Sequence, residues 1–264
     1  MSASFNTLAL SFDGAIARIW LDRPELRNAF DDVVIRELSE AFSQAGAAND
    51  VRVIVLGGNG PAFCAGANLN WMRRAAGFTH EQNLADAGGL AEMLRTIHES
   101  PKPVIARVQG DVYAGGMGLV AACDVAVSVD TASYCLSEVK IGLIPATISP
   151  YVLRAMGTRA AQRYFLSAER FSAAEAHRIG FVHEVVTADA LDAKVAEIAK
   201  AFTGASPAAV RACKQLIADV AGRQIDDALI AKTVQGIADI RASEEGREGV
   251  QAFLQKRKPS WLAG

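Results

Sequence analysis

The sequence predicts an α/β fold followed by a helical C-terminal region. Over roughly the first 187 residues, short apolar β-branched runs alternate with segments whose apolar residues recur at helical spacing. Two of the apolar runs are followed by glycine-rich turns. After residue 187 no strand is evident, and the helical segments are separated by three breaks, near Ser206-Pro207, Gly222 and Ser243. We therefore predict a core of residues 1–187 and a helical oligomerisation region of residues 188–264.

Composition narrows the class of protein. Of the 264 residues, 51% are hydrophobic and 21% are charged, which are ordinary values for a globular protein with a substantial core. The net charge of −2 gives no general attraction to nucleic acid or to an anionic membrane. No apolar run is long enough to cross a bilayer, and the N-terminus lacks the basic and apolar segments of a secretion signal. The four cysteines and four histidines show no metal-ligand spacing. We expect a cytoplasmic protein with reduced cysteines, no metal and no nucleic-acid partner.

The first 56 residues predict a hairpin, a helix and a buried strand. Leu8–Ser11 and Ile16–Leu21 flank the turn residues Asp13-Gly14. Asp31 can cap a helix, because an apolar repeat at helical spacing follows it, at Val34, Leu38, Ala41 and Phe42. Val51–Leu56 is a compact apolar run typical of a central strand.

The middle of the chain continues the alternation of strands and helices. Residues 61–69 form a small-residue turn that runs into a helix, and Leu84–Glu99 reads as an amphipathic helix. Val104–Val108 and Val125–Val129 are predicted strands. The small-residue segment Met117–Ala122 between them is predicted to be helical.

The last part of the core predicts short elements. Ile148–Met156 and Arg159–Ser167 are expected to be two short helices. Ser172 begins a capping-box pattern, and Gly180 is a plausible residue to end the helix that follows. Phe181–Val186 is predicted to be the last strand.

One glycine pair suggests a site for a negatively charged oxygen. Gly115-Gly116 follows a strand and begins a helix, so unpaired backbone N–H groups point outward at the positive end of the helix dipole. Such a terminus binds an anion, or an oxygen that becomes anionic during a reaction. The turn at residues 61–69 has the same character, and the two turns together could supply one N–H each to a shared oxygen. The alternative for either turn alone is ordinary helix capping.

Motifs at characteristic spacing identify a family resemblance. These motifs are Arg23-Pro24 with Asn28-Ala29, Phe63–Ala67, Gly110 with Gly115-Gly116 and Cys123-Asp124, and the C-terminal 252–258. Together they resemble the crotonase superfamily, the enoyl-CoA hydratases and isomerases, over essentially the whole chain. The resemblance implies a spiral of ββα units, a helical trimerisation region, and a homotrimer or a dimer of trimers. It also implies an acyl-CoA thioester substrate and no separate cofactor.

The resemblance assigns roles to individual residues. The backbone N–H groups of Ala67 and Gly115 would stabilise the thioester oxygen, and Glu138 would be the principal acid and base. Phe253 and Lys256 match residues that reach CoA from a neighbouring subunit, although a basic tail alone would more simply be solvated. The complete set of implied substrate-binding residues is Glu25, Arg27, Ala29, Ala65, Asn68, Leu69, Tyr113, Gly116, Phe253 and Lys256.

One position departs from the hydratase pattern. Hydratases of this family use two glutamates, and the first should fall at position 118, where this chain has Gly118. Glu138 alone could move a proton between two carbons, which would make the protein a double-bond isomerase. In the second reading, which we favour, it is still a hydratase. Its water is then held by Glu138 with help from Asn68, Tyr113, Ser137 or the substrate itself. A non-catalytic acyl-CoA-binding protein is a third reading, disfavoured because Glu138 and both glycine turns are present.

The segments around the site also suggest a substrate. Residues 136–150 and 63–74 resemble the subgroup that hydrates methylglutaconyl-CoA or its isohexenyl relative. A substrate that carries its own carboxylate could pair with an arginine, of which the candidates are Arg73, Arg74 and Arg154.

Overall fold

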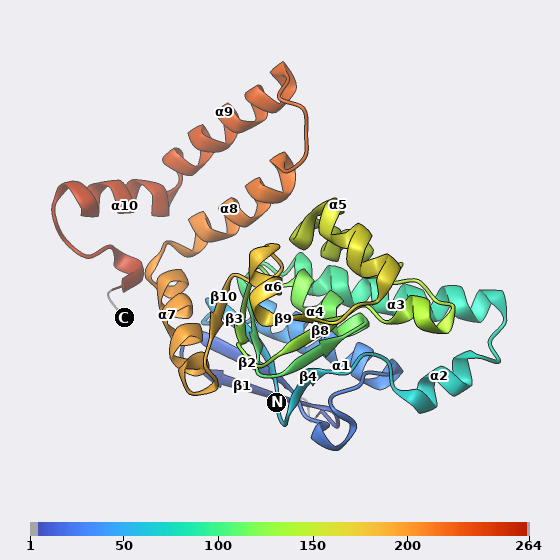
Figure 1. The fold of residues 1–264 in the computed structure, drawn as a ribbon. Helices are drawn as coiled ribbons and strands as arrows, with labels where there is room; N and C mark the ends of the chain where they lie inside the picture. The colour runs from blue at the N-terminus through green and yellow to red at the C-terminus, as the bar shows by residue number, and fades with distance from the viewer. Residues whose placement is uncertain (1–4, 263–264) are drawn as a thin grey trace.

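A computed structural model describes residues 5–262 and shows two stacked sheets with helices around them (Figure 1). Residues 1–4, part of the stretch inspected for a secretion signal, and residues 263–264 lie outside the described residues. Among the helices of residues 5–262, none is both long and apolar enough to span a membrane.

The larger sheet has six strands in the order β1-β2-β3-β5-β7-β10. Only β1 runs antiparallel to its neighbour, while the other pairs are parallel. All six residues of β3 are buried, as expected for a central parallel strand with both faces covered. The strands are β1 (Leu8–Asp13), β2 (Ile16–Leu21), β3 (Val53–Gly58), β5 (Val104–Val108), β7 (Val125–Val129) and β10 (Glu184–Val186).

The smaller sheet has four short strands in the order β4-β6-β8-β9, of which the first three are parallel. Each of β4, β6 and β8 follows a strand of the larger sheet along the chain, and helices follow each pair. The chain is therefore a spiral of ββα units, which confirms the fold class inferred from the resemblance. The strands are β4 (Ala62–Cys64), β6 (Asp111–Tyr113), β8 (Ser133–Cys135) and β9 (Phe171–Ser172).

Two of the core helices start at the caps predicted from the sequence, Asp31 and Ser172. Asp31 accepts hydrogen bonds from the N–H groups of Val33 and Val34 at the start of α1. A capping box that the sequence analysis missed, between Thr79 and Gln82, starts α3 earlier than predicted. The core helices are α1 (Asp32–Ala47), α2 (Leu69–Ala75), α3 (His80–His98), α4 (Gly115–Ala122), α5 (Ser149–Ser167) and α6 (Ala173–Arg178).

The two helices predicted between Ile148 and Ser167 occur as one helix, α5, with an interruption. Gly157 within it has φ 74° and ψ 161°, which is not helical. The predicted interruption of the helix thus occurs at Gly157, although the helical segments before and after it follow each other directly.

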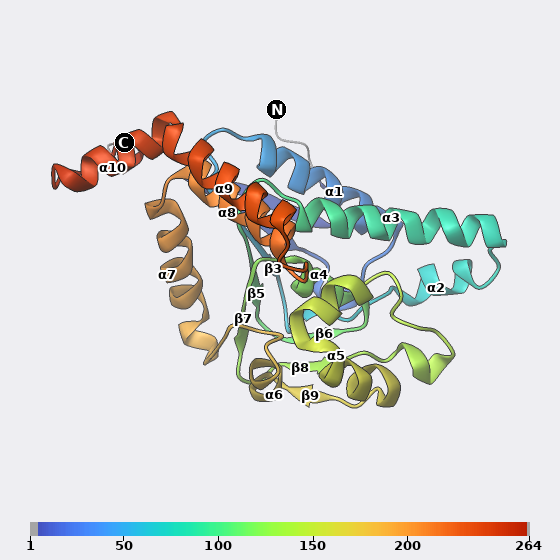
Figure 2. The same ribbon diagram turned by 90° about the horizontal axis from the view of Figure 1, so that it is seen from above.

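Four C-terminal helices confirm the predicted helical region. α7 (Leu191–Gly204) buries Leu191, Val195 and Ala199 in the core, whereas α8 (Pro207–Val220) buries no residue. Figures 1 and 2 show that α8, α9 (Asp227–Ala242) and α10 (Glu244–Leu254) extend away from the sheets. The part of residues 188–264 that stands clear of the core thus begins after α7.

Candidate active site

The smaller sheet brings three separate turns to one edge. Because β4, β6 and β8 are adjacent and parallel, their carboxyl ends lie together. Ala67 follows the end of β4 by three residues, Gly115 follows β6 by two, and Glu138 follows β8 by three. The crevice at the carboxyl ends of strands is the usual place for a ligand in parallel α/β sheets. The three residues predicted to be catalytic are therefore gathered by topology.

Ala67 presents its N–H away from the protein backbone. It forms an isolated parallel bridge with Phe30, in which Phe30 donates to the carbonyl of Gly66 at 2.9 Å. The N–H of Asn68 donates to the carbonyl of Phe30 at 2.8 Å. Gly66 and Asn68, the neighbours of Ala67, make both hydrogen bonds of this parallel bridge, so the N–H of Ala67 itself points away from Phe30. The Ala67 N–H is thus left for a ligand.

Gly115 begins α4 after a strained residue. Ala114 has φ 48° and ψ −122°, a sparsely populated positive-φ conformation that costs an alanine roughly 1–3 kcal/mol. As the first residue of the helix, Gly115 has an N–H with no partner inside the helix. A β-carbon at Gly115 would overlap the Phe30 ring, lying 2.6 Å from its Cε1, so only glycine fits. Strain at Ala114 and close packing at Gly115 together fix the direction of this N–H.

The two turns are packed against each other. Gly66 has φ +88°, and a β-carbon there would lie 3.1 Å from both the Ala114 Cβ and the Tyr113 carbonyl oxygen. A β-carbon at Gly116 would lie 2.8 Å from the Cys64 carbonyl oxygen. The glycines therefore permit backbone-to-backbone contact between the Ala67 turn and the Gly115 turn. This contact supports the convergence that the sequence analysis proposed.

Glu138 has the properties of an acid/base group. It begins the 3-10 helix η2 (Glu138–Ile141), and its Oε2 is buried without a hydrogen-bond partner among the described residues. Burial raises the pKa of its carboxyl above the ordinary glutamate value. A buried polar atom without a partner is rare in folded proteins and marks a place where a substrate or water would bind.

The position of the missing glutamate is filled by apolar side chains. A β-carbon at Gly118 would overlap Cγ2 of Ile148, and it would lie 2.8 Å from Ile148 Cβ and 3.5 Å from Leu94 Cδ2. Ile148 is only 2% exposed. This structure consequently has no room for a second carboxylate at position 118, and Glu138 has no acidic partner there.

Of the residues proposed to help hold water, two each have one polar atom engaged in a hydrogen bond within the protein. Asn68 is buried, and its Oδ1 caps α2 by accepting from the N–H groups of Asn70 and Trp71. The Tyr113 hydroxyl donates to Asp111 Oδ2 at 3.3 Å, and Arg170 lies over its ring. Burial and the negative charge of Asp111 raise the pKa of Tyr113.

The predicted CoA-binding loops lie next to each other. The N–H of Ala65 donates to the carbonyl of Arg27 at 3.0 Å, which joins the loop after η1 (Pro24–Leu26) to the turn after β4. Glu25 and Arg27 are exposed, while Ala29 is buried. Leu69, at the start of α2, is 69% exposed. These loops form a continuous rim beside Ala67.

Each of the three candidate arginines has one polar contact, and within residues 5–262 only Arg74 among them is in an ion pair. Arg74 pairs with Asp32 across α2 and α1. Nη1 of Arg154 lies 3.3 Å from Nε2 of His98, at the end of α3. Leu94 lies one turn earlier on α3 and is next to Gly118. Arg154 is therefore at the end of α4 remote from Gly115. Arg73 contacts only Asn70 among the described residues, with its Nη1 donating to Oδ1 at 2.6 Å.

Phe253 and Lys256 are not joined to the site within one chain. Phe253, on α10, is 82% exposed, and Lys256 follows the helix with φ 56°. Figures 1 and 2 both show α10 on the opposite side of the molecule from α2 and α3.

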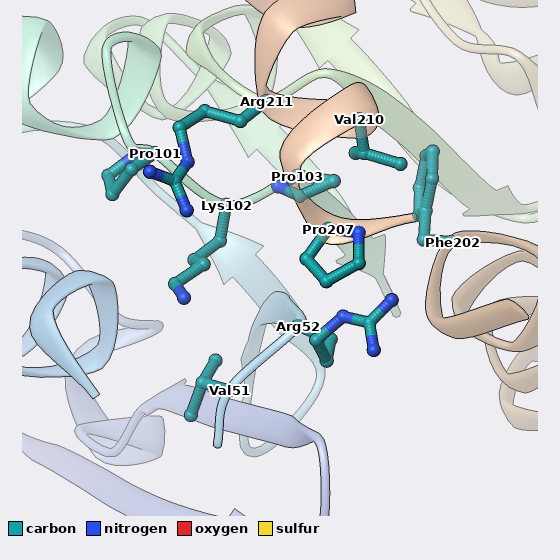
Figure 3. A pocket seen from close by; sticks show the side chains of 9 residues that line it. All are labelled: Val51, Arg52, Pro101, Lys102, Pro103, Phe202, Pro207, Val210 and Arg211. Carbon is teal, nitrogen blue, oxygen red and sulfur yellow. The ribbon is translucent and has the colours of Figure 1, made fainter. Parts of the chain in front are cut away.

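A second hollow lies at the other edge of the sheets. It is lined by Arg52, Lys102 and Arg211 together with apolar residues, between the starts of β3 and β5 and the start of α8 (Figure 3). Its enclosed space of ≈ 10 Å³ holds about one water molecule. Its lining contains no carboxylate, histidine, cysteine or hydroxyl side chain, so we do not assign the reaction to it. Within residues 5–262, no three His, Cys, Asp or Glu side chains are grouped as metal ligands would be.

Three residues of the site were missed by sequence reasoning. Phe30 supplies the ring that forces glycine at position 115, Ala114 sets the turn, and Ile148 fills the notch at Gly118. The absence of a glutamate at position 118 was visible in the sequence. The side chain that fills the volume next to Gly118 is that of Ile148, thirty residues later, and no sequence pattern indicated this contact.

Known proteins resemble this chain over nearly its whole length. The family model described as "Enoyl-CoA hydratase/isomerase" matches residues 11–263. The crystal structure of an enoyl-CoA hydratase from Shewanella pealeana is 43% identical, with a TM-score of 0.95, and the match covers 97% of this chain and 96% of that one. An enoyl-CoA hydratase from Mycobacterium smegmatis is 32% identical, with a TM-score of 0.91 and coverage of 97% and 98%. The mevalonyl-coenzyme A hydratase of Aspergillus fumigatus is 35% identical over 250 residues, 93% of this chain and 91% of that protein.

Proposed function

Because this chain belongs to the enoyl-CoA hydratase/isomerase family, we propose that it is a hydratase that adds water across a 2-enoyl-CoA with one carboxylate, Glu138. The observation that carries the proposal is the buried Oε2 of Glu138, which has no hydrogen-bond partner within residues 5–262, at the same sheet edge as the backbone N–H groups of Ala67 and Gly115.

The backbone donors would stabilise the charge that develops on the thioester oxygen. When water attacks the β-carbon, electrons move through the double bond to that oxygen and form an enolate. N–H groups of Ala67 and Gly115 are fixed by packing before the reaction and need not reorganise, and losing one such donor typically costs about 3–4 kcal/mol of barrier. Alanine scanning would miss them because they belong to the main chain.

Glu138 would serve as base and then as acid. Its carboxylate takes one proton from water as the oxygen bonds to the β-carbon, and it returns that proton to the α-carbon as the enolate collapses. The two steps together add one water molecule to the double bond and leave Glu138 ionised, as it was at the start. A raised pKa suits the first step, because a more basic carboxylate takes a proton from water more readily.

We further propose a methyl-branched acyl group that carries a polar end. The relative named for mevalonyl-coenzyme A supports a branched acyl chain, as does the resemblance of residues 136–150 to methylglutaconyl-CoA hydratases. Apolar side chains exposed after Glu138, at Ile141, Leu143 and Ile144, suit an apolar chain. Arg73 is the candidate partner for a substrate carboxylate, since Arg74 is paired and Arg154 is remote.

We propose that the protein works as a trimer or a dimer of trimers. α8 to α10 expose apolar side chains to solvent, including Ile217, Val234 and Phe253, which a neighbouring subunit would cover. A neighbour's Phe253 and Lys256 could then reach the CoA moiety, which they do not do within one chain.

Double-bond isomerisation is the alternative function, and one observation favours it. Apolar side chains fill the site of the second acid, and a single base suffices to move a proton between two carbons. The loss or gain of ultraviolet absorbance by the conjugated enoyl thioester separates the two functions. We expect absorbance to fall with crotonyl-CoA or 3-methylglutaconyl-CoA. A rise with a 3-enoyl-CoA and no fall with either conjugated substrate would replace the hydratase by an isomerase. No change with any of the three would favour a binding protein.

A further inference from the structure

Ile148 closes the loop that begins at the catalytic carboxylate. Between Glu138 and Ile148, the stretch 140–146 is exposed except for Pro145. Few of its backbone hydrogen bonds reach beyond the loop itself, as illustrated by Leu143, whose N–H donates to the Glu138 carbonyl at 3.1 Å. Such a segment has little packing of its own to hold it in place.

The Ile148 side chain enters a notch in α4. Position 118 is glycine and buried, and a β-carbon there would overlap Ile148 Cγ2 and lie 2.8 Å from Ile148 Cβ. Two carbon atoms normally approach to about 3.5–4.0 Å, so the notch exists only because residue 118 lacks a side chain. Leu94 of α3 forms another wall of the notch.

Both ends of the contact lead to the active site. Gly118 lies one turn after Gly115, whose N–H is a proposed oxyanion donor, on the short helix α4. Ile148 precedes α5, and α5 packs against both α4 and η2. The contact therefore couples the element that carries the donor to the loop that carries Glu138.

We propose that Ile148 is a positioning residue, which holds Glu138 in place relative to the oxyanion donors by inserting into the notch at Gly118. This inference rests on the proposed role of Glu138. The proposal explains why position 118 is glycine and not glutamate: the space at this position holds Ile148, which anchors the loop that begins at Glu138.

Two substitutions and their combination test the contact. Gly118→Ala fills the notch and must push Ile148 out, whereas Ile148→Gly empties it. Glycine is acceptable to the backbone at position 148, which is the N-cap of α5, but the substitution also removes a buried side chain and should lower stability. A misplacement of about 1 Å can cost about 10²-fold in rate, so Gly118→Ala is expected to lower kcat by that order with a smaller change in KM. The double variant relieves the overlap but lacks the anchoring side chain, so its kcat is expected to stay as low as that of Ile148→Gly, which should fall by the same order.

Two further measurements separate positioning from general damage. Gly118→Ala should increase hydrogen–deuterium exchange in residues 136–150. It should also move the Glu138 limb of the pH profile of kcat/KM toward the ordinary glutamate pKa, because the loosened carboxylate is better solvated. Val195→Ala, which removes buried volume on the distant α7, should lower thermal stability without changing either quantity.

The exchange measurement does not depend on turnover. If wild-type protein turns over no enoyl thioester, the proposed function fails, and the exchange comparison still decides whether Ile148 anchors the loop. Wild-type exchange in Gly118→Ala would overturn the inference. So would an Ile148→Gly variant with wild-type exchange and kcat, because it lacks the anchoring side chain.

Discussion

Glu138→Gln is the substitution that most directly perturbs the proposed chemistry. Glutamine has the same shape and cannot take a proton from water. Oε2 of Glu138 has no hydrogen-bond partner among the described residues, so the substitution breaks no contact there and should leave folding and thioester binding nearly unchanged. One acid/base group contributes about 10²–10⁴-fold to a rate. Because the volume at Gly118 is occupied by Ile148, no second carboxylate can replace it, and we expect the loss to lie toward the upper end.

The assay is steady-state hydration followed by absorbance, with the dissociation constant of a saturated acyl-CoA measured in parallel by calorimetry. Asp189→Asn is a suitable control, because that exposed carboxylate lies on the short η3 (Ala188–Ala190), outside the sheet edge. Turnover of Glu138→Gln within a few-fold of wild type would remove Glu138 from the mechanism. Weaker thioester binding in parallel with the rate loss would instead show that the residue holds substrate.

The same carboxyl makes a prediction about stability. Since burial raises the pKa of Glu138, the folded protein holds more protons than the unfolded chain between the unfolded and folded pKa values. The free energy of unfolding contributed by this group is thus fully present below the unfolded pKa and falls as the pH rises through the folded pKa. Glutamine cannot ionise, so Glu138→Gln should gain stability relative to wild type on going from acid to neutral pH, as measured by urea unfolding; a relative loss would contradict a raised pKa.

Two further substitutions and one truncation test the supporting geometry. Ala114→Gly should raise the free energy of unfolding by about 1 kcal/mol in urea titration, because glycine adopts the φ of 48° without strain, and a loss of stability would refute the strained turn. Asn68→Ala should cost about 1 kcal/mol by removing the cap of α2, and an unchanged unfolding midpoint would mean that solvent replaces the cap. Truncation before Gly249 should weaken CoA binding measured by calorimetry, and unchanged affinity would show that Phe253 and Lys256 play no part in it.

The elements with strong local signals were predictable from the sequence. The hairpin around Asp13-Gly14, the cap at Asp31 and the strand at Val104–Val108 were each predicted and occur as expected. These features depend on nearest-neighbour patterns, which a single sequence displays directly. The four C-terminal helices were predictable for the same reason.

The smaller sheet was not predictable, although it gathers the site. β4, β6 and β8 have three residues each, too few to show an alternating pattern. Their pairing is set by the longer strands that precede them, which is a tertiary effect. The sequence suggested that the turns at Ala67 and Gly115 converge, but only the sheet explains why Glu138 joins them.

The contact between Ile148 and Gly118 illustrates the same limit. A single glycine indicates a close approach but does not say what approaches. Here the neighbour is a side chain thirty residues away in sequence, brought back by α5 packing on α4. The residue types at the site could be found from sequence, whereas the reason for the missing acid required the fold.

The stereochemical course of hydration in deuterium oxide tests the single-carboxylate mechanism most directly. A conjugated enoyl-CoA would be hydrated in deuterium oxide, and the relative configuration of the α-deuterium and the β-oxygen would be determined by nuclear magnetic resonance. One carboxylate on one face of the double bond predicts that both are added to the same face. Addition to opposite faces would require a second acid/base group and would contradict the role assigned to Glu138.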